Sequence, residues 1–125
     1  MENLIIASTL KSPGVTFNTN GDLLIAGKSI PEDSNSYYKP LFAWLEEFKK
    51  TSPPEVNLTL KLEYMNTSSV RIILKFLQNL VAMSKENVKL KIKWVYDFDD
   101  DDICEQGEII QESIKFPIEM VEHRA

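Results

Sequence analysis

The amino-acid sequence predicts one α/β domain over residues 1–125, with a mixed, mostly parallel sheet, an N-terminal β-hairpin and helices packed mainly on one face. Stretches that alternate apolar and polar residues are interleaved with stretches whose apolar residues recur every three or four positions, which favours parallel strands joined by helices. The pair Asn20-Gly21 between two short apolar runs is a strong hairpin signal. The longer predicted strands are polar at every second position, so one face of the sheet should be open to water.

The first half of the chain is expected to hold the hairpin and one helix. Leu4–Ile6 is a short strand or arm, and residues 15–18 and 23–26 form the hairpin strands. The helix is predicted from apolar residues spaced by three and four positions, namely Tyr38, Leu41, Phe42, Leu45 and Phe48. We expect Ser36 to be its N-cap, Pro40 to lie in its first turn, where proline is tolerated, and Ser52-Pro53-Pro54 to end it.

The second half of the chain alternates strands with helices. Residues 56–64 and 88–96 have a period of two and are predicted to be strands. Residues 70–81 carry a helical apolar stripe, and residues 103–114 carry a weaker one. Residues 116–120 alternate again, and Pro117 makes this segment an edge strand or the start of a strand, because proline cannot donate to a neighbouring strand.

The composition bounds the kind of protein. Of 125 residues, 43% are hydrophobic and 26% are charged, as in ordinary globular domains. The net charge of -5 argues against nucleic acid and against direct contact with anionic membranes. A single cysteine, Cys104, allows no internal disulfide, and the N-terminus lacks the basic start and long apolar run of a signal peptide. We therefore expect a cytoplasmic protein.

The sequence contains no arrangement typical of catalysis, so we expect a protein that is not an enzyme and needs no cofactor. His123 lies near the C-terminus, a poor place for a general base, and Cys104 is flanked by acidic residues that raise a thiol pKa. The run Asp99–Asp102 is interpreted as a solvated helix start, because it lacks the mid-loop glycine of a calcium site. We predict no metal site, and the run could still contact a partner.

The segment Met65-Asn66-Thr67-Ser68-Ser69 lies where a predicted strand passes into a predicted helix. Asn66, Thr67 or Ser68 could serve as the helix N-cap, which is the commoner role of such residues. A second interpretation is phosphorylation, since a phosphoryl group adds about 1.5 to 2 negative charges and several acceptors. The helix dipole and the free amides of the first turn would stabilise such a group. A partner docking there would meet a very different surface.

Three apolar residues lie beside the main stripe of the second predicted helix, and their role is open from sequence alone. Ile72, Phe76 and Met83 could widen the contact of this helix with the core. If exposed, they would instead form an apolar docking patch next to the hydroxyl segment. The candidate partner-binding residues are Asn66, Thr67, Ser68, Arg71, Ile72 and Phe76.

Several segments together resemble the SiaC family of biofilm regulatory phosphoproteins, whose STAS-like fold is similar to that of anti-sigma factor antagonists. The matching segments are Thr9 with Ser12-Pro13, residues 21–29, residues 31–34 with Tyr37-Tyr38, Pro40-Leu41 and Trp44, residues 62–69, residues 94–97 with residues 105–108, and Phe116-Pro117-Ile118. Their order and spacing cover nearly the whole chain.

The resemblance implies a signalling protein that works by partner switching. It implies phosphorylation of Thr67 by a cognate protein kinase, with Ser68 and Ser69 as secondary candidates, and dephosphorylation by a metal-dependent serine/threonine phosphatase. It further implies that the unphosphorylated form activates a diguanylate cyclase and thereby promotes cyclic-di-GMP synthesis and biofilm growth. The alternative is a STAS-like domain that senses a small ligand without phosphorylation.

Overall fold

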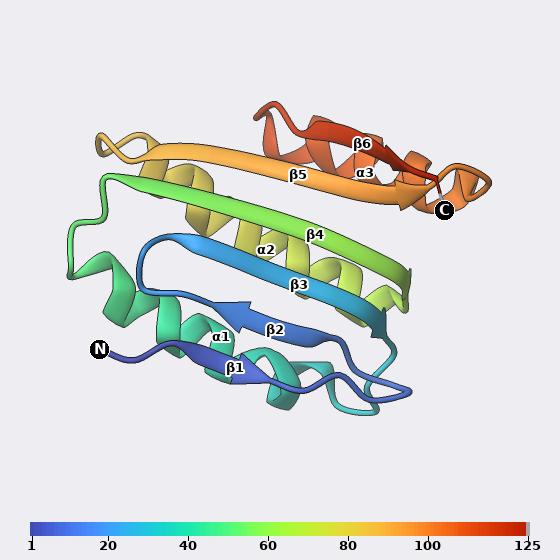
Figure 1. The fold of residues 1–125 in the computed structure, drawn as a ribbon, viewed down its shortest axis with the longest axis horizontal. Helices are drawn as coiled ribbons and strands as arrows, with labels where there is room; N and C mark the ends of the chain where they lie inside the picture. The colour runs from blue at the N-terminus through green and yellow to red at the C-terminus, as the bar shows by residue number, and fades with distance from the viewer. Residues whose placement is uncertain (125) are drawn as a thin grey trace.

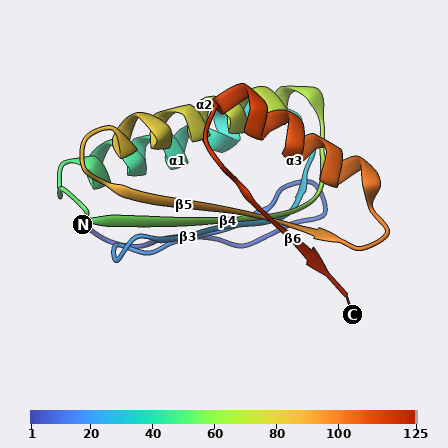
Figure 2. The same ribbon diagram turned by 90° about the horizontal axis from the view of Figure 1, so that it is seen from above.

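The computed structural model describes residues 1–124, which form one sheet of six strands in the order β1-β2-β3-β4-β5-β6. Three helices lie on one side of this sheet, as Figure 1 shows face-on and Figure 2 shows from above. The elements are β1 (Leu4–Ile6), β2 (Gly14–Phe17), β3 (Asp22–Ser29), α1 (Ser34–Lys49), β4 (Glu55–Met65), α2 (Thr67–Ser84), β5 (Lys89–Asp97), α3 (Asp101–Ile114) and β6 (Glu119–His123). The predicted single-faced α/β fold is therefore confirmed.

The predicted hairpin is formed by β2 and β3, which are antiparallel, and β1 adds an antiparallel edge strand. The turn needs Gly21, because its φ of 102° lies in the region that other residues rarely adopt and a Cβ there would collide with the Glu55 carbonyl oxygen. From β3 onward all neighbouring strands are parallel. The carboxyl ends of β3, β4 and β5 consequently share one edge of the sheet, where the chain passes into the helices.

The alternation along β4 divides the sheet into a buried and a solvated face. Val56, Leu58, Leu60 and Leu62 are at most 3% exposed and face the helices, whereas Lys61 and Glu63 are exposed on the other face. Each leucine buried in this way stabilises the fold by about 1.5–3 kcal/mol relative to an exposed one. The core thus lies in one layer between sheet and helices. Within residues 1–124, no helix combines the length and the hydrophobicity needed to cross a bilayer.

The start of α1 differs from the prediction. Asp33, and not Ser36, is the N-cap, since Asp33 Oδ1 accepts the Ser36 amide at 3.1 Å and Asp33 Oδ2 accepts the Ser36 hydroxyl at 2.7 Å. An aspartate three residues earlier competes successfully for the cap because its carboxylate accepts both donors. Pro40 therefore lies in the second turn of α1, where it is exposed.

The last strand also begins later than predicted. Lys115 ends α3 in the left-handed conformation with φ 54°, and the Ile118 amide donates to Gln111 Oε1 at 2.6 Å. Because the Ile118 amide donates to this side chain, it is not available to the neighbouring strand. Strand pairing therefore starts at Glu119, opposite Lys93. β6 is an edge strand, as expected from Pro117.

Candidate functional site

The turn between β4 and α2 is an N-cap built by Asn66. Its backbone is extended, with φ -79° and ψ 169°, and its Oδ1 accepts the Ser69 amide at 2.9 Å. The Asn66 carbonyl accepts the Val70 amide at 3.1 Å and begins the helix ladder. The cap interpretation of this segment is confirmed, with Asn66 as the capping residue.

The same turn is fixed to the end of β3. The Asn66 amide donates to the Ser29 carbonyl at 3.0 Å, and Asn66 Nδ2 reaches the Pro31 carbonyl at 3.5 Å. A residue near the start of α2 is therefore held against the loop that leads from β3 into α1. Both helix starts meet at this corner of the fold.

Three buried hydroxyl groups connect α1, β3 and α2, and we call them the hydroxyl chain. The Tyr38 hydroxyl lies 2.6 Å from Ser29 Oγ, Ser29 Oγ donates to Ser69 Oγ at 2.7 Å, and Ser69 Oγ donates to the Ser29 carbonyl at 3.0 Å. Tyr38 is 1% exposed, and both serines are 0% exposed. Because the Ser29 hydroxyl donates its one hydrogen to Ser69, the hydrogen bond between Tyr38 and Ser29 is donated by the Tyr38 hydroxyl.

The environment of the hydroxyl chain keeps Tyr38 protonated. Burial raises the pKa of Tyr38 to about 12 and outweighs the lowering effect of its interactions with the Ser29 and Ser69 hydroxyl groups. A protonated Tyr38 keeps donating to Ser29 over the whole physiological range. The chain is a structural connection between the two helices.

The three hydroxyl residues after Asn66 have different surroundings. Ser69 is buried in the hydroxyl chain, so it is not accessible in this fold. The Ser68 hydroxyl is exposed but engaged, because it lies 2.6 Å from Ser34 Oγ and donates to Asn66 Oδ1 at 3.1 Å. Thr67 is exposed, and its hydroxyl has no hydrogen-bond partner among residues 1–124. Of the three, Thr67 is the one whose hydroxyl is accessible without breaking a hydrogen bond among the described residues.

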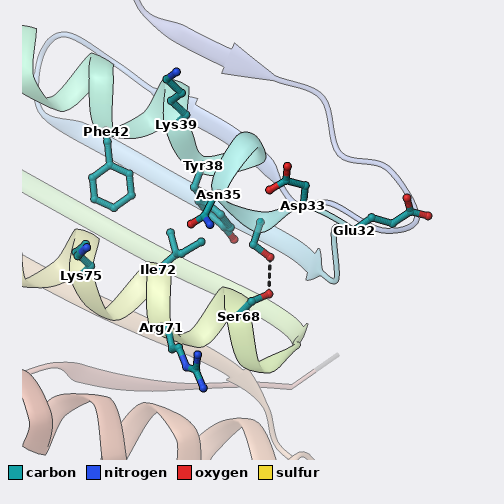
Figure 3. Close-up of a pocket in the computed structure, with 11 residues that line it drawn as sticks. Glu32, Asp33, Asn35, Tyr38, Lys39, Phe42, Ser68, Arg71, Ile72 and Lys75 are labelled. Atoms are coloured by element: carbon teal, nitrogen blue, oxygen red, sulfur yellow. Dashed lines mark hydrogen bonds between the residues drawn. The ribbon is translucent and has the colours of Figure 1, made fainter.

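Beside this corner lies an open groove of about 720 Å³ between the first turns of α1 and α2. Figure 3 shows Phe42 of α1 and Ile72 of α2 on its two walls, and both side chains are half-buried. Arg71 and Lys75 of α2 also line it, and Ser68 lies at the end nearest the helix starts. The candidate residues Ser68, Arg71 and Ile72 thus share one surface.

Phe76, one of the predicted partner-binding residues, is buried in this fold and does not line the groove. It is 2% exposed and packs on Phe17, with ring centroids 5.7 Å apart, and on Phe42, at 5.4 Å. Met83 is buried as well, at 4% exposure, so both residues widen the core contact of α2. Ile72 is the one member of this trio that reaches the surface.

Sequence reasoning missed Ser29 and Ser34, and it treated Tyr38 as a plain core residue. The alternation of Leu23 and Ile25, continued to residue 29, would have placed Ser29 on the helix-facing side. Ser69 could have been recognised as buried, because it lies four residues before Ile73 on the apolar stripe of α2. Buried hydroxyl groups at such positions need partners, which these residues provide for one another.

The acidic run and the cysteine singled out from the sequence lie at α3. Asp100 caps α3 by accepting the Ile103 amide at 3.0 Å, and Asp101 and Asp102 lie in its first turn, as the helix-start interpretation predicts. Burial raises the pKa of the Cys104 thiol, whose Sγ lies 3.5 Å from Glu108 Oε1. In the part of the chain that the structure describes, no three metal-binding side chains come together.

The architecture defines a class: small α/β domains with one sheet, helices on a single face and an antiparallel N-terminal hairpin. Comparison with protein families is specific within that class. The model for the SiaC family, described as regulatory phosphoproteins, matches residues 6–123. The chain therefore belongs to the SiaC family of regulatory phosphoproteins, as its sequence segments predicted.

Known relatives and structures agree with this assignment. A protein of Pseudomonas aeruginosa strain UCBPP-PA14 is 27% identical over 124 residues, which is 98% of each chain. The fold matches that of SiaC of Pseudomonas aeruginosa with a TM-score of 0.90 and 27% identity, covering 98% of this chain and 100% of that chain. It also matches SiaC in the crystal structure of diguanylate cyclase SiaD with its activator SiaC, with a TM-score of 0.90 and 27% identity over 96% and 99% of the two chains.

Proposed function

We propose that this protein is a non-catalytic partner-switching phosphoprotein whose phosphorylated residue is Thr67. The observation that carries the proposal is the contrast among neighbouring hydroxyls: Thr67 is exposed and without a partner within residues 1–124, while Ser68 and Ser69 are engaged. A kinase acting on Thr67 breaks no hydrogen bond of the fold. Modification of Ser68 would disturb its contacts with Ser34 and Asn66, and modification of Ser69 would require unfolding the corner.

The fold tolerates a phosphoryl group on Thr67. The cap uses the amides of Ser69 and Val70, whereas those of Thr67 and Ser68 have no partner among the described residues. They are available to the phosphate oxygens, and the helix dipole adds about 0.3–1 kcal/mol for a negative charge at this end. Phosphorylation therefore changes the surface of the protein far more than its stability.

The partners we propose follow from the family and from this surface. A cognate protein kinase adds the phosphate, and a metal-dependent serine/threonine phosphatase removes it. The unphosphorylated form binds the output partner, and by analogy with the complex of SiaC and SiaD, that partner is a diguanylate cyclase. On this proposal the protein acts in the cytoplasm and controls cyclic-di-GMP synthesis and biofilm growth. It needs no cofactor of its own.

Phosphosite mapping by mass spectrometry on the protein isolated from its native cell tests the proposal. We expect phosphate on Thr67 in at least one growth condition and its loss in a Thr67→Ala variant. Thr19→Ala is the matched control, because Thr19 is an exposed threonine in the hairpin turn. Phosphate found only on other residues, or on none under any condition, would exclude Thr67 as the switch.

A further inference from the structure

The groove between α1 and α2 combines two apolar walls with a cationic rim. Phe42 and Ile72 project into the space between the two helices, as Figure 3 shows. Lys39, Arg71 and Lys75 also line the groove, and the Arg71 side chain extends from the side of α2 that faces away from α1. Both apolar side chains are half-buried, so covering them would remove further apolar area from water. A groove between two helices with such walls suits an amphipathic protein segment.

The rim of the groove carries three cationic side chains and, at one end, two acidic ones. Among residues 1–124, Lys39, Arg71 and Lys75 form no salt bridge. Two carboxylates lie at one end of the groove: Asp33, whose two hydrogen bonds from Ser36 lower its pKa and keep it negatively charged, and Glu32, which lies 3.9 Å from Lys11. In a protein with a net charge of -5, the lining of this groove thus carries more cations than carboxylates, and the three cations have no ion-pair partner in the described residues.

We propose that this groove receives an acidic, amphipathic segment of the output partner. Apolar side chains of that segment cover Phe42 and Ile72, and its carboxylates lie against the lysine and arginine groups of the rim. The inference rests on the proposed function, which it extends by assigning the chemistry of the partner. It also explains the effect of the switch, because Thr67 and Arg71 are four residues apart on one helix and their side chains are neighbours.

Phosphorylation would act on this groove by charge. A phosphoryl group on Thr67 neutralises Arg71 and adds negative charge next to the position that the partner's carboxylates take. Apolar contacts with Phe42 and Ile72 would remain available, but the electrostatic part of the affinity would turn from attraction to repulsion. The site of modification and the site of docking are then adjacent, and neither element needs to change its shape.

Site-specific photo-crosslinking in the native cell tests the docking site. Phe42 is replaced by the photoreactive aromatic residue p-benzoylphenylalanine, and Leu24, which is 38% exposed on the opposite face of the sheet, carries the same probe as a control. Both proteins also contain Thr67→Ala, so that docking is scored whether or not Thr67 is ever phosphorylated. Failure of the docking proposal and failure of the phosphorylation proposal are thereby separated.

We expect the probe at position 42 to capture a peptide of another protein that contains both acidic and apolar residues. Reversal of the rim charges by Arg71→Glu with Lys75→Glu should lower the yield about tenfold, while Lys91→Glu on the open face of the sheet should leave it unchanged. Melting curves of the purified variants show that each is folded. The proposal is overturned if the crosslinking yield at position 42 is no higher than at position 24, or if the charge reversal does not lower it. Capture of a basic peptide, or of a second copy of this chain, would also overturn it.

Discussion

Replacing Ser29 by alanine removes the central member of the hydroxyl chain and should destabilise the protein by about 2 kcal/mol. The Tyr38 hydroxyl loses an acceptor at 2.6 Å, and Ser69 Oγ loses a donor at 2.7 Å, in a region where all three residues are at most 1% exposed. A buried polar group left without its partner costs about 1–3 kcal/mol. Serine and alanine are close in size, so this loss of hydrogen bonding dominates the effect.

Urea unfolding followed by tryptophan fluorescence measures that change. With a denaturant slope of about 1–3 kcal/mol per molar, 2 kcal/mol lowers the midpoint by about 1 M. Ser113→Ala is the matched control, because Ser113 is exposed and its hydroxyl donates only to the Ile109 carbonyl of its own helix. Such a surface change should stay within about 0.5 kcal/mol.

A double-mutant cycle separates the hydroxyl chain from a simple change of volume. Tyr38→Phe alone should cost about 1 kcal/mol, since one hydrogen bond is lost and no large cavity forms. In the Ser29→Ala background the same change should cost almost nothing, because the acceptor of the Tyr38 hydroxyl is already gone. Strictly additive costs, or a Ser29→Ala variant as stable as Ser113→Ala, would refute the connection between α1 and α2 described above.

Further predictions concern stability at alkaline pH, the N-cap of α2 and the close contact between Gly107 and Trp94. Tyr38 has a folded pKa of about 12 against a usual value of 10, so the unfolded chain loses that proton first. Stability should be full below pH 10 and fall as the pH rises toward 12, and Tyr38→Phe should flatten this decline in urea unfolding series. Asn66→Ala should lower the free energy of unfolding by about 1 kcal/mol, because the Ser69 amide loses its cap. Gly107→Ala should cost about 1–3 kcal/mol, since its Cβ would lie 2.6 Å from Trp94 Cδ1, and altered tryptophan fluorescence should accompany the loss.

The sequence contained enough information for the architecture. The two-residue alternation of Val56, Leu58, Leu60 and Leu62 predicted a sheet with one open face, and the structure has it. The boundaries of the helices were harder to predict, because several neighbouring residues can serve as the N-cap. Ser36 and Asp33 both suit an N-cap, and the choice depends on a carboxylate geometry that no pattern specifies.

The sequence predicted which segment forms the candidate site, but not how the side chains of that segment are arranged in space. Adjacent residues in the sequence, Thr67, Ser68 and Ser69, point to different surroundings because each step along a helix turns the side chain by about 100°. The partner of Ser69 is Ser29, 40 residues away in sequence, and the partner of Ser68 is Ser34, 34 residues away. Such contacts depend on the parallel crossover from β3 through α1 to β4, which places both helix starts at one edge.

The most direct test of partner switching compares two forms of the purified protein, one with unmodified Thr67 and one with phosphothreonine incorporated at position 67 during synthesis. Each form is used for quantitative affinity capture from lysate of the native cell, with Thr67→Ala as a third bait. The account predicts a partner, a diguanylate cyclase by analogy, that is enriched at least about tenfold on the unmodified and Thr67→Ala baits over the phosphorylated one. Equal recovery of every partner on all three baits would contradict it.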